Sequence, residues 1–227
     1  MRAGANPARM TPASMIDLKL CGLRDPAHID AAVGAGATHI GLVRFARSPR
    51  HVSMDEAAAL ADHARGRAQV VVVTVNADDG EIDALIARVR PDMVQLHGAE
   101  APERAAALRE RVPVIKAMAV RTRADLARAD AYAPRVDALL LDARPPEGSD
   151  LPGGNGVGFD WSILRGFAPP VPWFLSGGLN ADNVAEAIRS GARALDLSSG
   201  IEDAPGVKSL ARIRAVGEAV RAATLPA

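Results

Sequence analysis

Residues 173–200 read WFLSGGLNADNVAEAIRSGARALDLSSG, and this stretch decides how the rest of the chain is interpreted. Two short apolar runs, at 173–175 and 194–197, are each followed by a turn of small residues, and a helix is predicted between them over residues 180–189. Glycines let the backbone approach an anion closely, and the N–H groups at the start of a helix carry partial positive charge. The two turns therefore predict a phosphate clamp at the ends of two neighbouring strands.

The same alternation of strand and helix extends backwards along the chain. The predicted strands cover residues 16–22, 39–43, 69–75, 93–96, 114–117, 138–141, 173–175 and 194–197. The predicted helices cover residues 25–34, 56–65, 79–89, 101–111, 122–129, 160–164, 180–189 and 208–222. Strict alternation favours a parallel sheet with right-handed crossovers. Eight units predict an α/β fold that closes into a single-domain parallel (β/α)₈ barrel (TIM barrel), in which the loops after strands 7 and 8 commonly bind phosphate.

The length and composition fit one such barrel. The chain has 227 residues, of which 48% are hydrophobic and 24% charged, slightly fewer residues than the roughly 250 typical of this fold. Residues 16–227 are predicted to form the catalytic barrel. Residues 1–15 have no apolar core and are predicted to be a flexible leader, with Met1, Met10 or Met15 as the true start.

Charge and cysteine content limit the partners. The 27 Lys and Arg residues balance the 27 Asp and Glu residues, and no block of five like charges occurs, so neither nucleic acid nor a membrane surface is indicated as a partner. The apolar runs are too short to span a bilayer. A single cysteine excludes an internal disulfide and suits a reducing compartment. The sequence therefore predicts a cytoplasmic protein, monomeric or homodimeric, that acts on a small phosphorylated molecule.

Two residues at predicted strand ends form a candidate base and acid. Cys21 ends the first strand, and a thiol can act as a general base if its pKa is lowered, here by the charge of Lys19 on the same strand face. Asp142 ends the sixth strand after an apolar run, and partial burial would raise its pKa and suit it to general acid catalysis. By themselves, a lone cysteine is more often a buried filler and such an aspartate is equally often a cap. The loop that follows, residues 143–158, holds three prolines and five glycines and is predicted to be a mobile lid.

Other residues at the same rim are candidates for binding. Arg50, after the second strand, offers a planar fork to a carboxylate or phosphate, while His97 and Asp196 are weaker candidates for substrate binding. No spacing of His, Cys and carboxylates resembles a metal site, and no strand-first glycine pattern resembles a nucleotide site, so neither a metal nor a cofactor is predicted. The phosphate-binding residues are predicted to be Gly177, Gly178, Ser198, Ser199 and Gly200, joined by Gly154 and Gly156 of the long loop.

An ordered set of short motifs carries a family resemblance. The motifs are KLCG at 19–22, SPR at 48–50, VQLHG at 94–98, LLD at 140–142, GGNG at 153–156, FDW at 159–161, LSGGL at 175–179 and DLSSG at 196–200. Each motif alone is weak, but their order over nearly the whole chain is specific. Together they resemble the phosphoribosylanthranilate isomerases of tryptophan biosynthesis. The resemblance implies a cofactor-free Amadori rearrangement of N-(5-phosphoribosyl)anthranilate to 1-(2-carboxyphenylamino)-1-deoxyribulose 5-phosphate.

The resemblance also implies a role for each matching residue. Asp142 would protonate the furanose ring oxygen, which opens the ring to a Schiff base. Cys21 would then remove the proton from C2′ of the ribose, and the resulting enolamine would tautomerise to the ketone. Arg50 would hold the anthranilate carboxylate, and Asp196 would face the anthranilate nitrogen.

The strand 2 motif departs from the family pattern at one position. The family usually has an aromatic residue after the G-F-V run, whereas this chain reads Gly41-Leu42-Val43-Arg44. Phe45 is one position later and is expected to cover the same surface, against the anthranilate ring.

Three alternatives remain open from the sequence. An indole-3-glycerol phosphate synthase would need a lysine acid at a strand end in a longer chain. A ribulose-phosphate epimerase would need a metal set of His and Asp at strand ends, which the sequence does not show. A non-catalytic phosphosugar-binding barrel would keep the phosphate loops without needing both Cys21 and Asp142.

Overall fold

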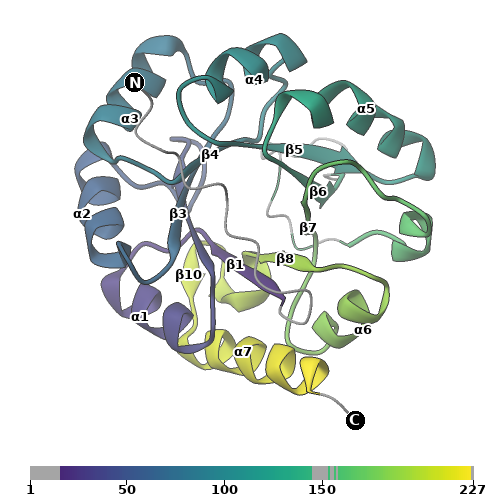
Figure 1. Ribbon diagram of the computed structural model, residues 1–227. Coiled ribbons are helices and arrows are strands. Elements are labelled where there is room, and N and C mark those ends of the chain that lie inside the picture. The colour runs from purple at the N-terminus through teal and green to yellow at the C-terminus, as the bar shows by residue number, and fades with distance from the viewer. Residues whose placement is uncertain (1–15, 145–152, 154–155, 157, 226–227) are drawn as a thin grey trace.

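Eight parallel strands close into a barrel in the computed structural model, which describes residues 16–144, 153, 156 and 158–225 (Figure 1). The first strand pairs with the last, so the predicted barrel is confirmed. The strands of the barrel are β1 (Asp17–Cys21), β2 (His39–Arg44), β3 (Gln69–Thr74), β4 (Met93–Leu96), β5 (Val114–Val120), β6 (Ala138–Ala143), β7 (Trp173–Leu175) and β8 (Ala194–Leu197). The predicted leader, residues 1–15, lies outside the described residues, as does most of the predicted lid.

Helices cover the outside of the barrel and mostly begin at the caps that the sequence provides. They are α1 (Pro26–Gly34), α2 (Met54–Ala64), α3 (Asp79–Arg88), α4 (Pro102–Arg109), α5 (Ala129–Tyr132), α6 (Val184–Arg189) and α7 (Leu210–Thr224). The side chain of Ser53 accepts a hydrogen bond from the backbone N–H of Glu56, whose carboxylate accepts one from the N–H of Ser53, so the predicted capping box starts α2. None of the described helices is long and apolar enough to cross a membrane.

Three predicted helices differ from the structure in type or by several residues in their start. The helix predicted over residues 122–129 is a chain of short pieces, η1 (Arg123–Arg128), α5 and η2 (Ala133–Arg135), and Pro134 prevents a longer regular helix. The helix predicted to start at residue 180 starts at Val184. The side chains of Asn180 and Asn183 bind backbone N–H groups locally, and such bonds compete with helix formation. The short helix predicted at residues 160–164 is a 3₁₀ turn, η3 (Trp161–Leu164).

The sequence did not predict the small hairpin after the last barrel strand. A 3₁₀ turn, η4 (Ser199–Ile201), leads into β9 (Glu202–Ala204), which pairs antiparallel with β10 (Val207–Lys208). The final helix therefore begins at Leu210 rather than at residue 208, and Ser209 caps it. The hairpin lies near the first and last strands of the barrel (Figure 1), which places its residues near the site described below.

Apolar side chains pack in two layers around the strands. The larger layer lies between the strands and the helices. The inner layer fills the barrel with Val71, Met93, Ile115, Ala117, Ala138, Leu140, Phe174 and Ala194. Because the interior is filled, a ligand can bind only at the strand ends. A third small cluster lies there, formed by Cys21, Val43 and Val73 with Phe45 packed against it.

The contact between α1 and α7 closes the outer layer where the two ends of the barrel meet. Gly217 of α7 packs against α1 so closely that an added Cβ would lie 2.6 Å from the carbonyl oxygen of Ala35. We therefore expect Gly217→Ala to lower the free energy of unfolding by about 1–3 kcal/mol, because the atoms it would meet are the backbone and Cβ of Ala35, which cannot rotate away. Urea denaturation measures this change.

Gly34, the last residue of α1, supplies a matched control because an added Cβ there would contact nothing within 4 Å. Gly34→Ala should leave the unfolding free energy unchanged or raise it by up to about 1 kcal/mol. If Gly217→Ala were as stable as Gly34→Ala, the close packing of α1 on α7 would be wrong.

Candidate active site

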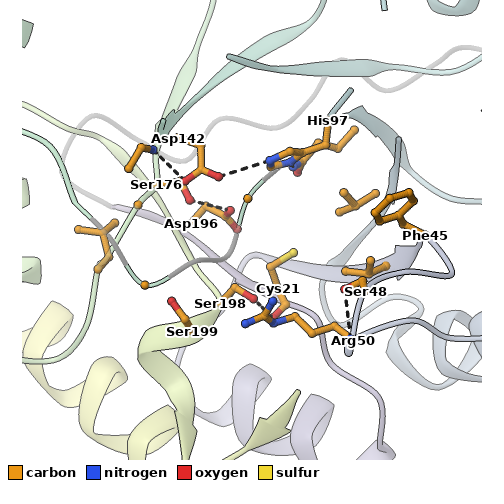
Figure 2. A pocket seen from close by; sticks show the side chains of 18 of the residues that line it. Cys21, Phe45, Ser48, Arg50, His97, Asp142, Ser176, Asp196, Ser198 and Ser199 are labelled. Atoms are coloured by element: carbon orange, nitrogen blue, oxygen red, sulfur yellow. Dashed lines mark hydrogen bonds and ion pairs between the residues drawn. The ribbon is translucent and has the colours of Figure 1, made fainter. Parts of the chain in front are cut away.

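A cavity opens at the carboxyl ends of the barrel strands and brings together most of the predicted site residues (Figure 2). Its walls come from nearly every strand and from the loops after β2, β6, β7 and β8. The predicted residues that line it are Cys21, Arg50, His97, Asp142, Gly156, Gly177, Gly178, Asp196, Ser198 and Ser199. Gly154 lies outside the described residues, and Gly200 lies beside the cavity rather than in its lining.

Asp142 on β6 has one hydrogen-bond donor and one imidazole beside its carboxylate. The carboxylate is 5% exposed; its Oδ1 accepts a hydrogen bond from the N–H of Ala143 at 3.0 Å, and its Oδ2 lies 3.3 Å from Nε2 of His97. Gly153 lies directly over this pair, because an added Cβ would be 2.4 Å from Nε2 of His97 and 2.5 Å from Oδ2 of Asp142. The backbone at Gly153 thus covers the proposed acid at a position where a side chain would not fit.

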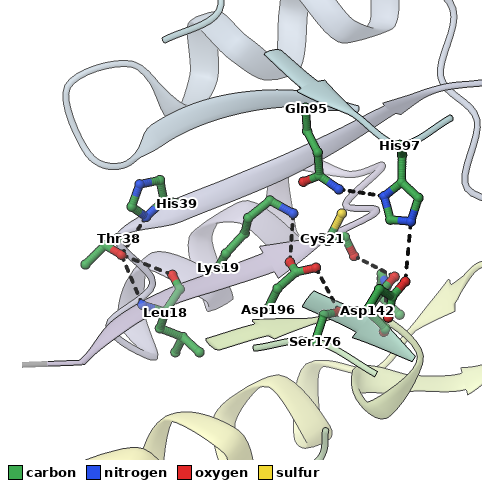
Figure 3. A network of polar contacts seen from close by, with 12 residues as sticks. Leu18, Lys19, Cys21, Thr38, His39, Gln95, His97, Asp142, Ser176 and Asp196 are labelled. Carbon is green, nitrogen blue, oxygen red and sulfur yellow. Dashed lines mark hydrogen bonds and ion pairs between the residues drawn. The ribbon is translucent and has the colours of Figure 1, made fainter. Parts of the chain in front are cut away.

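Gln95 fixes the orientation of His97, and the sequence analysis missed it. The side-chain nitrogen of Gln95 lies 2.7 Å from Nδ1 of His97 (Figure 3). When the amide donates to Nδ1, the imidazole carries its proton on Nε2, which faces Asp142. Gln95 and His97 are two positions apart at the end of β4, so both side chains point to the same face. This spacing could have indicated the contact from the sequence. His97 therefore acts on Asp142 from the side opposite to the β6 backbone.

Cys21 lies beside a buried ion pair. Nζ of Lys19 lies 2.7 Å from Oδ1 of Asp196, with the two side chains 0% and 5% exposed, and Ser176 donates to the other carboxylate oxygen at 3.2 Å (Figure 3). Burial disfavours the Lys19 ammonium, but Asp196 and Cys21 outweigh it and raise the pKa of Lys19. Asp196 is therefore a structural partner of Lys19 as well as part of the cavity wall.

The expected lowering of the Cys21 pKa is wrong for the free protein. Burial raises the pKa of the Cys21 thiol, and the charges of Lys19 and Lys208 only partly offset it. The negative charge of Asp196 raises it further, because it disfavours a second negative charge on the thiol. The space around the sulfur depends on Gly41, where an added Cβ would be 2.5 Å from Sγ. Cys21 is thus a buried thiol that becomes a strong base once it is ionised.

Arg50 has a partner that the sequence did not reveal. Its Nε and Nη2 each lie 2.7 Å from a carboxylate oxygen of Glu202, in the hairpin after β8. The guanidinium is nearly buried and still lines the cavity, near Cys21 and Ser198 (Figure 2). Glu202 was unpredictable because the hairpin carries no recognisable motif.

The two glycine loops after β7 and β8 form one wall of the cavity, as predicted from their spacing. Gly177 has a φ of +91°, and an added Cβ would lie 2.7 Å from the backbone nitrogen of Ala143, so the turn needs glycine. Gly200 packs against the carbonyl oxygen of Leu179, which an added Cβ would overlap. Gly200 therefore joins the two loops to each other, and phosphate binding by its backbone stays a prediction.

Phe45 lines the cavity wall, where it packs against Cys21, Val43 and Val73. Arg44 points elsewhere, since Nη1 donates to the carbonyl oxygen of Val52 at 2.7 Å and Nη2 pairs with Glu81 at 3.3 Å. An aromatic side chain thus lines the cavity one position later in the chain, and its contact with the substrate ring stays a prediction.

Comparison with known proteins decides the family. The sequence profile of PRAI, N-(5′-phosphoribosyl)anthranilate (PRA) isomerase, matches residues 18–219. The chain belongs to this isomerase family. It is 49% identical over 208 residues to the N-(5′-phosphoribosyl)anthranilate isomerase of Brucella canis, a match that covers 90% of this chain and 94% of that protein.

Solved structures of PRA isomerases agree in fold. The phosphoribosyl anthranilate isomerase of Thermotoga maritima superposes with a TM-score of 0.83 at 32% identity, covering 92% of this chain and all of the other. A second PRA isomerase structure, at 30% identity and a TM-score of 0.80 with the same coverage, contains reduced 1-(o-carboxyphenylamino)-1-deoxyribulose 5-phosphate. The family resemblance read from the sequence motifs is therefore confirmed.

None of the described residues that line the cavity is a lysine. Lys116 on β5 points away from the cavity, and its Nζ donates to the carbonyl oxygens of Leu96 and Gly98 and to Glu100, at 3.2, 2.7 and 2.9 Å. The strand-end lysine acid of the synthase alternative is thus not found here. Over the described part of the chain, no group of three or more His, Cys, Asp or Glu side chains could hold a metal ion.

Cys21 is the sole cysteine, so its ionisation can be followed directly. We expect the ultraviolet absorbance of the thiolate to rise with a midpoint above pH 9, because burial raises the Cys21 pKa from its ordinary value of 9.0. Cys21→Ala should abolish the signal. A midpoint near neutral pH would show that the lysine charges outweigh burial.

Proposed function

We propose that this PRA isomerase converts N-(5′-phosphoribosyl)anthranilate to 1-(2-carboxyphenylamino)-1-deoxyribulose 5-phosphate, with Asp142 as general acid and Cys21 as general base. The observation that carries the proposal is that both side chains line one cavity together with the two glycine loops. Membership of the family supports the reaction, and the placement of these two residues supports their roles.

The surroundings of Asp142 suit an acid that must release its proton. Protonation of the furanose oxygen leaves a carboxylate at Asp142. That carboxylate accepts a hydrogen bond from the Ala143 N–H and lies 3.3 Å from Nε2 of His97, whose ring Gln95 holds. These contacts hold the carboxylate at the cavity wall, where it can hand its proton to the substrate. His97 acts in this proposal through Asp142 and as part of the substrate-binding wall.

The surroundings of Cys21 suit a base that acts on carbon. After the ring has opened, the Schiff base makes the C2′ proton acidic, and the thiolate removes it. Burial gives the Cys21 thiolate a high proton affinity, and the charges of Lys19 and Lys208 stabilise it once formed. The enolamine then tautomerises to the ketone, so that proton transfers alone complete the isomerisation.

Three further groups would position the substrate. Arg50 would bind the carboxylate of the anthranilate ring, next to the aromatic surface of Phe45. Asp196 would face the anthranilate nitrogen with the oxygen that Ser176 also contacts. The loops after β7 and β8 would hold the phosphate through their backbone N–H groups. The monomeric or homodimeric state and the cytoplasmic location stay predictions from the sequence.

The activity is tested by adding N-(5′-phosphoribosyl)anthranilate to the purified protein and following the loss of its fluorescence. The proposal predicts enzyme-dependent loss without added metal or cofactor. A protein that leaves the fluorescence unchanged over the non-enzymatic background would contradict it.

Replacing the proposed base should affect turnover more than binding. We expect Cys21→Ala to lower kcat by about 10²–10⁴-fold, the usual loss for a positioned acid or base, with little change in KM. Turnover within a few-fold of the wild type would remove Cys21 from the chemistry.

Replacing the proposed acid provides a second, independent test. Asp142→Asn keeps the shape of the side chain and can still pair with His97, but it has no proton of suitable pKa to give. We expect kcat to fall by about 10²–10⁴-fold while the circular dichroism spectrum and the melting temperature change little. If the variant instead fails to fold, Asp142 has a structural role and the acid lies elsewhere.

A further inference from the structure

Glu202 in the hairpin after β8 is the centre of a buried charge cluster that none of the motifs singled out. We infer that Glu202 is a positioning residue, which fixes the guanidinium of Arg50 and thereby makes binding depend on a carboxylate on the substrate's aromatic ring. The inference rests on the proposed function, because it assigns the ring carboxylate to Arg50.

The contact between Glu202 and Arg50 fixes the guanidinium plane. Oε1 of Glu202 lies 2.7 Å from Nε of Arg50, and Oε2 lies 2.7 Å from Nη2. Two parallel charge-assisted hydrogen bonds allow only one orientation of the planar group. Arg50 and Glu202 are only 5% and 8% exposed, so water competes little for these bonds. The Nε–Nη2 edge of Arg50 is thus engaged, and the guanidinium can meet a ligand in only one orientation.

Lys208 gives Glu202 a second cationic partner. Its Nζ lies 2.7 Å from Oε1 of Glu202 and donates to the carbonyl oxygen of Ser198 at 2.8 Å and to its hydroxyl at 3.3 Å. The Ser198 hydroxyl in turn donates to the carbonyl oxygen of Cys21 at 3.2 Å. Burial alone would raise the pKa of Glu202, but Arg50 and Lys208 outweigh it and hold it below its usual range. Among the described residues, one carboxylate thus lies between two cationic side chains beside a cavity proposed to bind an anion.

The hairpin also fixes the backbone that carries Arg50. Gly206 at its turn has a φ of +81°, and an added Cβ would lie 2.6 Å from the carbonyl oxygen of Pro49. The same carbonyl oxygen accepts a hydrogen bond from Arg24 at 3.0 Å. Both ends of the Arg50 side chain are therefore held, one through Pro49 and the other through Glu202. This double attachment is what a residue that recognises a planar carboxylate requires.

The test compares two ligands on two variants. The ligands are reduced 1-(2-carboxyphenylamino)-1-deoxyribulose 5-phosphate and the same compound without the ring carboxylate, and their Kd values are measured by calorimetry. Glu202→Gln removes the charge and places an amide against one guanidinium N–H. We expect the variant to raise the Kd of the ligand with the ring carboxylate by about tenfold or more. The Kd of the ligand without it should rise by less than about twofold. Asp203→Asn is the matched control, since Asp203 follows Glu202 directly but is exposed and pairs only with Arg212 among the described residues; neither Kd should change.

Each other outcome contradicts the inference. If Glu202→Gln raises both Kd values equally, Glu202 has a merely structural role. If neither Kd rises, Arg50 is positioned without Glu202. If Glu202→Gln does not fold, Glu202→Asp is tested in its place. This variant keeps the charge and withdraws the carboxylate by one methylene. It must likewise raise the Kd of the ligand with the ring carboxylate selectively. A wild type that isomerises phosphoribosylanthranilate but binds the two ligands equally would overturn this inference alone. A wild type that neither isomerises this substrate nor binds either ligand would overturn the proposed function as well.

Discussion

The ion pair between Lys19 and Asp196 is the interaction on which the site depends. It joins the first barrel strand to the last, with the two residues directly opposite each other in the β1–β8 pairing. Both charges are buried, so loss of either partner would leave an uncompensated charge at a cost of about 3–5 kcal/mol. Replacing the pair by apolar residues could preserve the fold, but it would remove the charges beneath Cys21. The pair therefore serves the position and electrostatics of the site more than it serves stability.

Closure of the barrel at this pair explains how distant parts of the chain share one cavity. Cys21 comes from the first strand, Asp142 from the sixth and the phosphate loops from the last two, yet all of them lie at the carboxyl ends of parallel strands. Two charged groups in the wall have buried ion-pair partners: Asp196 has Lys19, and Arg50 has Glu202. Fixed partners keep these groups in place before the substrate arrives, so little reorganisation is left for the reaction itself.

The sequence predicted the strands, the barrel and most of the cavity wall, because these features depend on local patterns. Alternating apolar runs and the small residues after them specify where strands end, and the strand ends specify the site. The features it missed depend on contacts between distant residues. The pKa of Cys21 depends on Asp196, 175 positions away in the chain, and the hairpin that holds Arg50 has no periodic pattern. The helix predicted at residue 180 starts later because two asparagine side chains bind the backbone, which helix periodicity does not reveal.

The central claim is that the acid and the base act on one substrate from two sides of the cavity. The most direct test is a crystal structure of this protein with reduced 1-(2-carboxyphenylamino)-1-deoxyribulose 5-phosphate bound. We predict that Sγ of Cys21 contacts C2′ of the ligand within about 4 Å, that Asp142 contacts the sugar oxygen released from the ring, and that the phosphate lies on the loops after β7 and β8. A ligand whose C2′ lies away from Cys21, or whose phosphate lies against Arg50, would contradict the account.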